Sequence, residues 1–253
     1  MSVSLKTLVN YSNQLLKIDR FKDYCPNGLQ VEGKSEIQTI ISGVTACQAL
    51  LDRALESQAD LILVHHGYFW KGESEPLVGI KGRRMRTLIK NDINLLAYHL
   101  PLDAHPTLGN NAQLAKLLGI RIEGGMDPHN EFSVGNIGSL EDPTSAEAFA
   151  QTVSAILGRQ AELISGGDRS VQRVAWCTGA AERMIEKADE LGADLFISGE
   201  ISEPVVHYAR EAGIHYLAAG HHATERYGAK ALGEHLSSHF GLSHEFIDID
   251  NPV

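Results

Sequence analysis

The amino-acid sequence predicts an α/β protein of two related α/β domains, with mostly parallel sheets and a binding site in the cleft between the domains. Apolar runs of strand length alternate with segments of helical periodicity along most of the chain. The same order of elements begins again after residues 123–131, which are rich in turn-forming residues. Strands that alternate with helices pair in parallel and carry the helices on the sheet faces, so each half is expected to form its own sheet.

The first half is expected to contain three buried strands separated by helices. The strands are predicted at residues 38–42, 60–64 and 93–98, and the helices at residues 46–57, 83–91 and 110–118. Gly119 is a typical C-terminal stop for the third helix, because glycine adopts the left-handed conformation that often ends a helix. This pattern predicts an N-terminal α/β domain over residues 1–125.

The second half repeats the alternation and predicts a C-terminal α/β domain over residues 126–253. Strands are predicted at residues 132–137, 161–164, 171–177, 193–198, 214–218 and 245–249. Helices are predicted at residues 145–157, 180–191, 203–211 and 223–237. Thr144 is the expected N-cap of the first of these helices, because Glu147 follows it three residues later.

The two halves also align residue by residue, which indicates an internal repeat. The segment that begins at Gln38 aligns without a gap with the segment that begins at Gln172, and a slightly shifted alignment extends the match. The equivalent residues are Asp60 and Asp194, His65-His66 and Gly199-Glu200, His99 and His221, and Asp103 and Glu225. Ligands of open α/β sheets bind at the carboxyl ends of strands, so two such halves would enclose a shared cleft.

Composition and charge indicate the cellular compartment and limit the possible classes of partner. Hydrophobic residues make up 43% of the chain, the mean hydropathy is -0.13, and no apolar run approaches the length of a membrane span. The first residues lack the features of a secretory signal, and the three cysteines are odd in number and far apart, so a reduced, cytoplasmic protein is expected. The net charge of -10 gives no overall attraction to a phosphate backbone, so nucleic acid is not an expected partner.

Two local motifs are typical of phosphate binding, but the residues around each motif predict a structural role instead. Residues Gly28 to Ser35 fit the written pattern of a phosphate-binding P-loop, with Lys34 as its lysine. A P-loop lysine opens a helix, whereas residues 37–42 are β-rich and Glu32 adds a negative charge, so a turn and hairpin are predicted instead. The basic run at residues 81–86 is predicted to be the solvated start of a helix rather than a contact for phosphate or an acidic subunit.

Histidines and carboxylates follow the predicted strands in a pattern expected of a metal site. Three pairs share this placement: His65 with His66, His99 with Asp103, and His221 with Glu225. Imidazole and carboxylate together suit zinc, manganese or iron. Neighbouring side chains of a strand point to opposite faces, so two consecutive histidines at a strand end could serve two adjacent ions. We therefore expect a dinuclear metal centre in the cleft.

The local chain distinguishes the two histidine-carboxylate pairs. His221 and Glu225 share one face if both lie in the first turn of the following helix. Pro101 argues against regular helix between His99 and Asp103, because the residue before proline avoids the helical region. Asp103 is accordingly expected in a loop or at a helix start, and His99 is the weaker candidate ligand.

Other polar residues near these strand ends are given supporting or structural roles. Glu200 follows a predicted strand and is expected either to support the metal site or to cap the next helix. Seven further histidines have no partner pattern and are expected to be structural or exposed: His105, His207, His215, His222, His235, His239 and His244.

Four segments carry a resemblance to a known family. They are Pro26 to Val31, Val64 to Gly67, His99 to His105, and Gly220 to Glu225. They resemble segments of the GTP cyclohydrolase 1 type 2 homolog family, also called Nif-three-like proteins, and the similarity spans nearly the whole chain. The sequence is similar to the short bacterial form, without the long insertion that some members carry between the halves. The resemblance implies two α/β domains, a dinuclear metal centre between them, and a ring-like homohexamer.

Carried over by motif, the resemblance implies the metal ligands and the kind of substrate. The implied ligands are His65, His66, Asp103, His221 and Glu225, which would hold two divalent ions per subunit, of zinc, iron, manganese or nickel. A small-molecule, nucleotide-like substrate is implied. A GTP cyclohydrolase reaction is attributed to some members of the family, and a DNA-damage or damaged-nucleotide role to others.

The chemistry of these residues favours a metal-dependent hydrolase. Two ions about 3.5–4 Å apart can share a water and lower its pKa, and Asp103 and Glu225 are the expected bridging carboxylates. With a GTP-like substrate, the activated water would attack the imidazole carbon of the purine and release formate. His99 is the expected catalytic acid or base. The alternative is a ring-shaped metal-binding scaffold without catalysis, but five protein ligands for two ions leave open positions, which favours the hydrolase.

Overall fold

Two units make up the chain in the computed structural model, which describes residues 1–253. The first unit contains Met1–Leu102 and Gly228–Asp250, and the second contains Asp103–Tyr227 and Asn251–Val253. The chain therefore passes into the second unit within helix α4 (Leu100–Ala104) and returns within helix α9 (His221–Phe240). The two units are therefore not separated by a single boundary after residue 125. The last strand, β13 (Ser243–Phe246), returns to the first unit and pairs with one of its strands.

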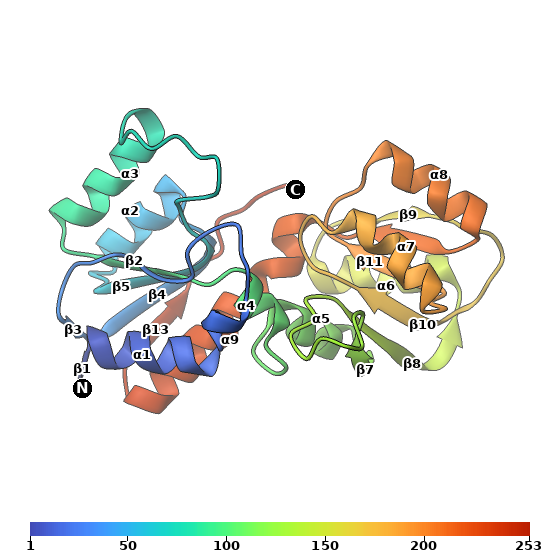
Figure 1. The fold of residues 1–253 in the computed structure, drawn as a ribbon, viewed down its shortest axis with the longest axis horizontal. Coiled ribbons are helices and arrows are strands. Elements are labelled where there is room, and N and C mark those ends of the chain that lie inside the picture. The colour runs from blue at the N-terminus through green and yellow to red at the C-terminus, as the bar shows by residue number, and fades with distance from the viewer. The chain divides into compact units, whose positions relative to one another are not determined.

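The first unit is built around a five-stranded sheet with helices on both faces (Figure 1). The strand order is β13-β4-β5-β6-β2, in which the first four strands are parallel and β2 is antiparallel. The strands are β2 (Gly28–Val31), β4 (Thr39–Thr45), β5 (Leu61–His66) and β6 (Asn94–Ala97), and a separate ladder joins β1 (Val3–Ser4) to β3 (Glu36–Ile37). The helices are α1 (Leu5–Leu15), α2 (Gln48–Glu56) and α3 (Gly79–Lys90), with a 3-10 turn, η1 (Ile18–Arg20).

Both faces of the three central strands, β4, β5 and β6, are buried. Ile41, Ile62 and Leu95 lie on the face that α2 and α3 cover, where they join a core with Leu50 and Leu88. The residues that alternate with them along the strands are buried as well, on the face where Figure 1 places α1 and α9. Burial on both faces explains why these strands are continuous apolar runs in the sequence rather than alternating ones.

The second unit contains a six-stranded mixed sheet in the order β7-β8-β10-β11-β12-β9. The central strands β10, β11 and β12 are parallel, and the other strands pair antiparallel. The strands are β7 (Arg121–Gly125), β8 (Asn136–Thr144), β9 (Glu162–Ile164), β10 (Val171–Trp176), β11 (Leu195–Ser198) and β12 (His215–Ala218). The helices are α5 (Asn110–Leu118), α6 (Ala146–Leu157), α7 (Ile185–Glu190) and α8 (Glu203–Ala212), with a 3-10 turn, η2 (Glu182–Met184).

The helices of the second unit enclose its sheet in the same way. Val174 and Trp176 of β10 belong to the core formed with α5 and α6. Ala175, between them, and Phe196 of β11 belong to the core formed with α7 and α8. The alternation of side chains along each strand therefore supplies both cores.

The predicted fold class, α/β with two similar domains, is confirmed. Both units contain a parallel β-α-β-α-β segment, β4-α2-β5-α3-β6 in the first and β10-α7-β11-α8-β12 in the second. In each unit the third of these strands has an antiparallel neighbour, β2 or β9, and leads into the helix in which the chain changes unit. The internal repeat detected in the sequence is thus a repeat of structure.

Three local predictions are wrong. The N-cap of α6 is Ser145, whose side chain accepts a hydrogen bond from the backbone N–H three residues later at 3.1 Å, whereas Thr144 ends β8. The strand expected to start at residue 132 starts at Asn136. Pro101 does not exclude a helix, because it lies in the first turn of α4, where a backbone N–H has no intrahelical partner to lose.

Two expectations from composition can be compared directly with the structure. None of the helices combines the length and the hydrophobicity that a membrane span requires. The three cysteines are free thiols, as expected. Burial, with a smaller contribution from Asp23, raises the pKa of Cys25 to about 12, and burial raises that of Cys177 well above its usual range. Neither side chain is therefore a reactive thiolate at neutral pH.

Candidate metal centre

Three histidines meet at the carboxyl end of the first sheet. Strand β5 ends in His65 and His66, and His99 follows β6, the neighbouring parallel strand. Each histidine offers a ring nitrogen, and these nitrogens lie within 4.8 Å of one another. The ring centroids of His65 and His66 are 4.5 Å apart, and those of His65 and His99 are 5.1 Å apart. Adjacent strand ends therefore bring these three predicted site residues together.

The surroundings of His65 determine which ring nitrogen it presents. His65 is fully buried, and its Nδ1 lies 2.9 Å from the carbonyl oxygen of Tyr98. A carbonyl oxygen only accepts, so Nδ1 carries the proton and Nε2 carries the lone pair. Metal-binding histidines are usually oriented by this kind of hydrogen bond. His65 is thus held in the tautomer that a ligand nitrogen requires.

His99 is held by a carboxylate, Asp23, that the sequence reasoning missed. Asp23 Oδ1 lies 2.7 Å from His99 Nδ1, and Asn27 Oδ1 accepts the backbone N–H of His99 at 2.7 Å. Burial raises the pKa of Asp23, but the hydrogen bonds from His99 and Asn27 outweigh burial and lower this pKa to about 2. Asp23 is therefore ionised at neutral pH, so His99 donates from Nδ1 and presents Nε2.

In the second unit, Asp103 is a buried carboxylate with dedicated donors. Its Oδ1 accepts hydrogen bonds from Asn110 Nδ2 at 2.8 Å and from Thr178 Oγ1 at 3.3 Å. Asn111 Nδ2 donates to the Asp103 backbone carbonyl at 3.3 Å. Asp103 is only 4% exposed, so Asn110 and Thr178 replace the water that would otherwise solvate its charge. Burial and donors together fix the carboxylate in one orientation.

His221 and Glu225 form the other group of the second unit. Helix α9 begins at His221, so Glu225 lies one turn later on the same face, as predicted. His221 Nε2 is 3.1 Å from Glu225 Oε2, and His221 Nδ1 is 2.6 Å from Glu200 Oε1. Burial lowers the pKa of His221, but Glu225 and Glu200 outweigh burial and raise this pKa to about 9. His221 must therefore release a proton before it can bind a metal ion. Glu200 thus contacts His221, one of the candidate ligands.

Two glycines leave room for these side chains. A Cβ atom on Gly179 would lie 2.2 Å from Glu225 Oε1 and 3.2 Å from His221 Nε2. A Cβ atom on Gly199 would lie 2.5 Å from His221 Cα. Gly199 is equivalent to His65 in the sequence repeat. A side chain does not fit at Gly199, because it would collide with the start of α9. The two halves therefore contribute different donors for a steric reason.

The donor set fits a divalent first-row metal. The structure contains groups of histidine, aspartate and glutamate side chains that could bind a metal ion. Nitrogen and carboxylate oxygen donors suit zinc, manganese and iron. The hydrogen bonds to His65 Nδ1 and Asp103 Oδ1 are the supporting contacts that metal sites use to orient ligands. Cys25 shares one such group with Asp23 and His99, but its raised pKa makes it the weakest donor there.

Several other histidines have structural roles, as expected. His215 Nδ1 accepts the backbone N–H of Gly166 at 3.2 Å, and its Nε2 donates to the Arg169 carbonyl at 2.8 Å. His105 Nδ1 accepts two backbone N–H groups of its own loop. His244 Nε2 lies 2.7 Å from a serine hydroxyl on β4. These contacts use the ring nitrogens to stabilise loops and strands.

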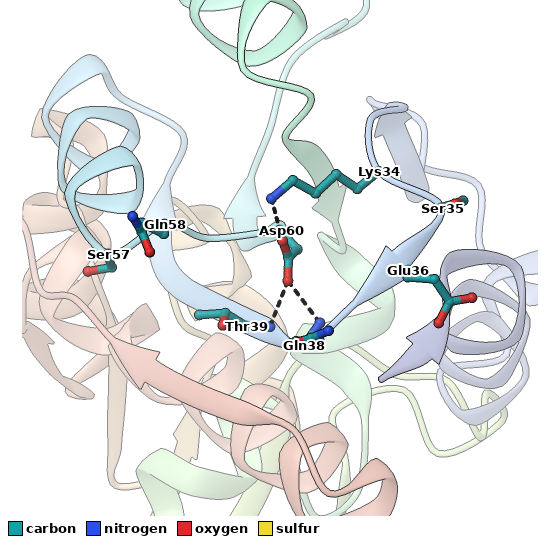
Figure 2. Close-up of a pocket in the computed structure, with 8 residues that line it drawn as sticks. All are labelled: Lys34, Ser35, Glu36, Gln38, Thr39, Ser57, Gln58 and Asp60. Atoms are coloured by element: carbon teal, nitrogen blue, oxygen red, sulfur yellow. Dashed lines mark hydrogen bonds and ion pairs between the residues drawn. The ribbon is translucent and has the colours of Figure 1, made fainter. Parts of the chain in front are cut away.

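The P-loop pattern around Lys34 is part of the fold and lies at the opposite end of the first sheet from the histidines. Figure 2 shows Lys34 Nζ bonded to Asp60 Oδ1, at 2.6 Å, while Asp60 Oδ2 accepts the backbone N–H groups of Gln38 and Thr39. These residues line a polar cavity of about 810 Å³ at the amino ends of β4 and β5. No helix begins at Lys34, and strand β3 follows it, so the prediction that this segment is not a P-loop is confirmed.

Comparison with known proteins decides the family. A family model described as Duf34/NIF3 (NGG1p interacting factor 3) matches residues 3–252. The chain belongs to this family. The match includes all the candidate ligands and both structural repeats, and it confirms the resemblance seen in the sequence.

Relatives in the family are similar over their full length. A GTP cyclohydrolase 1 type 2 homolog of Pseudomonas aeruginosa is 53% identical over 253 residues, which is 100% of both chains. Another of that name, from Vibrio cholerae, is 55% identical over 243 residues, or 95% of this chain and 96% of the relative. A solved structure of protein ybgI, described as of unknown function, has 50% identity and a TM-score of 0.95, and the match covers 99% of this chain and 100% of that chain.

Sequence reasoning missed three residues that support the site: Asp23, Asn110 and Thr178. Asp23 is separated from His99 by 76 positions, and Thr178 from Asp103 by 75. No periodicity or spacing rule relates such pairs. The only available signal was that Asp23 opens a turn-rich segment that ends at Asn27, just before and overlapping the segment that resembles the family.

Proposed function

We propose that this member of the Duf34/NIF3 family is a dinuclear-metal-dependent hydrolase that acts on a nucleotide-like small molecule. The hydrogen bond between Asp23 and His99, close to His65, carries this proposal. A metal ion that only stabilised the fold would need nothing beyond its ligands. A histidine held in one orientation beside those ligands also provides a proton acceptor, which a hydrolytic reaction requires. The relatives named GTP cyclohydrolase 1 type 2 homolog support a nucleotide-like substrate and a ring-opening hydrolysis.

The ligands that we propose come from both units. They are His65, His66, Asp103, His221 and Glu225. The chain changes unit within α4, which contains Asp103, and within α9, which begins with His221 and Glu225. Each donor group of the second unit therefore lies where the chain passes from one unit to the other. Two divalent ions of zinc, iron, manganese or nickel would supply Lewis acidity and a nucleophile at neutral pH.

His99 is the proposed catalytic residue. Asp23 accepts the Nδ1 proton of His99 and so leaves Nε2 to accept a proton from the attacking group. The same nitrogen can then return the proton to the leaving group. Asp23 acts as a positioning residue, because it holds the imidazole in one tautomer and one orientation.

The assembly and compartment belong to the same proposal. We propose a homohexamer that works in the cytoplasm on a small-molecule substrate, with neither a membrane nor a nucleic-acid partner. The net charge of -10 supports the absence of nucleic-acid binding, because a phosphate backbone would be repelled.

Metal analysis followed by a substrate screen tests the proposal. Elemental analysis of freshly purified protein is expected to find about two divalent ions per chain. The metal-loaded protein is then incubated with GTP, other nucleotides and simple phosphoesters, and formate and ring-opened products are measured. Asp103→Asn should lose both metal and activity, whereas Asp142→Asn, an exposed aspartate on β8, should retain both.

Two results would count against this function. If the wild-type protein retained its metal but released no product from any compound, the metal-binding scaffold would be the better description. If His65→Asn lost metal and failed to fold, while the wild-type protein showed no turnover, the ions would be structural.

A further inference from the structure

Two aromatic side chains beside His99 have no part in the metal and proton chemistry described above. The Tyr24 ring lies 6.4 Å from the His99 ring with an interplanar angle of 62°, and the Trp70 ring lies 4.9 Å from it at 83°. Trp70 also lies 5.9 Å from the ring of His66. Both belong to connections of the first unit, Tyr24 before β2 and Trp70 after β5.

We propose that Tyr24 and Trp70 form a stacking site for a planar nitrogen heterocycle, the ring of the substrate. This inference rests on the proposed function and deepens it, because it assigns the part of the site that binds the ring next to His99. Tyr24 is 64% exposed, although a tyrosine ring gains free energy when its faces are covered. A flat ring placed against it would provide that cover.

Hydrogen bonds hold both aromatic residues in place. The backbone N–H of Lys71 donates to the Tyr24 carbonyl at 2.7 Å, which ties the two connections together. The indole N–H of Trp70 donates to the Gly67 carbonyl at 3.2 Å. Glu73 Oε2 accepts the backbone N–H groups of Phe69 at 2.7 Å and of Trp70 at 3.1 Å. The stacking site is therefore built before any ligand arrives.

The chain conformation at Phe69 is a second sign of a built site. Phe69 has φ +66°, a left-handed conformation that bulky side chains rarely adopt. Lys81 Nζ lies 5.1 Å from the centre of its ring and 3.4 Å from Glu73 Oε2. Such conformations persist where the surrounding contacts fix them, and they occur often at binding sites. Here the conformation precedes Trp70 directly.

The chemistry of the two side chains favours flat rings over phosphates. The indole N–H of Trp70 is already used within its own loop, so this residue offers mainly its ring to a ligand. Stacking on aromatic side chains is available to any flat heterocycle, and it gives binding energy without reading a particular hydrogen-bond pattern. The ligand class is therefore a planar nitrogen heterocycle, with purines as the first to test.

Calorimetric titration with two probes tests the stacking site in the full-length, metal-loaded protein. The probes are guanosine 5′-monophosphate and ribose 5-phosphate, which differ in the ring. Tyr24→Ala should weaken guanosine 5′-monophosphate binding about fivefold or more and leave ribose 5-phosphate binding unchanged. Tyr24→Phe and Trp70→Phe keep a ring and should bind like the wild type. Leu77→Ala, 52% exposed in the connection that contains Trp70, is the matched control and should change neither affinity.

Other outcomes decide against the stacking site, and metal content separates its failure from that of the proposed function. Equal guanosine 5′-monophosphate affinity in Tyr24→Ala and wild type would overturn the inference, as would a change in oligomeric state with no change in affinity. The titrations are repeated after metal removal, because stacking does not require the ions. A metal-loaded protein that binds the base through Tyr24 but releases no product would contradict the hydrolase and retain the stacking site.

Discussion

Asp60 and Asp194 make matching contacts in the two units of this protein. Asp60 Oδ2 accepts the backbone N–H groups of Gln38 and Thr39, and Asp194 Oδ2 accepts those of Gln172 and Arg173. The two residues are equivalent in the sequence repeat; each carboxylate follows the helix between the first two parallel strands and holds the start of the first strand. A basic side chain also pairs with each, Lys34 at 2.6 Å and Arg169 at 3.8 Å.

Removing the charge of Asp60 should destabilise the first unit. Burial raises the pKa of Asp60, but Lys34 and the backbone donors outweigh burial and lower this pKa below its usual value. Its ionised form therefore stabilises the fold above about pH 4, and this contribution is lost as pH falls through the folded-state pKa. Asp60→Asn should lower the free energy of unfolding by about 1–3 kcal/mol at pH 7. Urea unfolding measures the difference, which should shrink in acid; Asp142→Asn should show neither effect.

Gly179 and Gly192 offer a matched pair of glycines in the second unit. Both have left-handed backbones, φ +71° and φ +72°, but a Cβ atom would collide with Glu225 only at Gly179, and nothing lies within 4 Å at Gly192. Both alanine variants should lose about 1–2 kcal/mol from backbone strain. Only Gly179→Ala should also lose metal, as measured by elemental analysis. Equal metal content in the two variants would show that Glu225 is not a ligand.

Asp23→Asn should alter the tautomer of His99 without removing metal. An amide in place of the carboxylate no longer holds the Nδ1 proton by charge, so the Nε2-protonated form of His99 should increase. Nitrogen-15 NMR of labelled histidine rings would detect this change. If His99 is the acid or base, hydrolysis should fall about a hundredfold to ten-thousandfold while the metal content stays constant. An unchanged ring spectrum would contradict the positioning role of Asp23.

Asn110→Ala should weaken metal binding through Asp103. The variant removes the 2.8 Å donor to Asp103 Oδ1, in a residue that is fully buried. Loss of such a supporting contact typically lowers metal affinity about tenfold to a hundredfold. Competition with a chelator would measure this loss. Lys116→Ala, an exposed position on the same helix, serves as the control and should keep the wild-type affinity.

The sequence predicted the central part of the fold and the candidate ligands more accurately than it predicted their supports. The apolar runs that became β5 and β11 are each continuous in the chain, so their character can be recognised locally. The predicted site residues His65, His66 and His99 meet for the same reason, because adjacent parallel strands end at one edge of the sheet. The edge strands and the N-cap of α6 were harder to predict, since neighbouring residues compete for the same boundary.

The order of strands and helices, the repeat, and the polar side chains that follow the strands can all be recognised in the sequence. Those features depend on periodicity and on residue chemistry over short stretches of chain. Other features emerge only in the folded chain: Asp23 orients His99, Thr178 and Asn110 hold Asp103, and β13 completes the first sheet. These pairings join distant parts of the chain, and they form because buried strands and buried charges must find partners wherever folding brings them together.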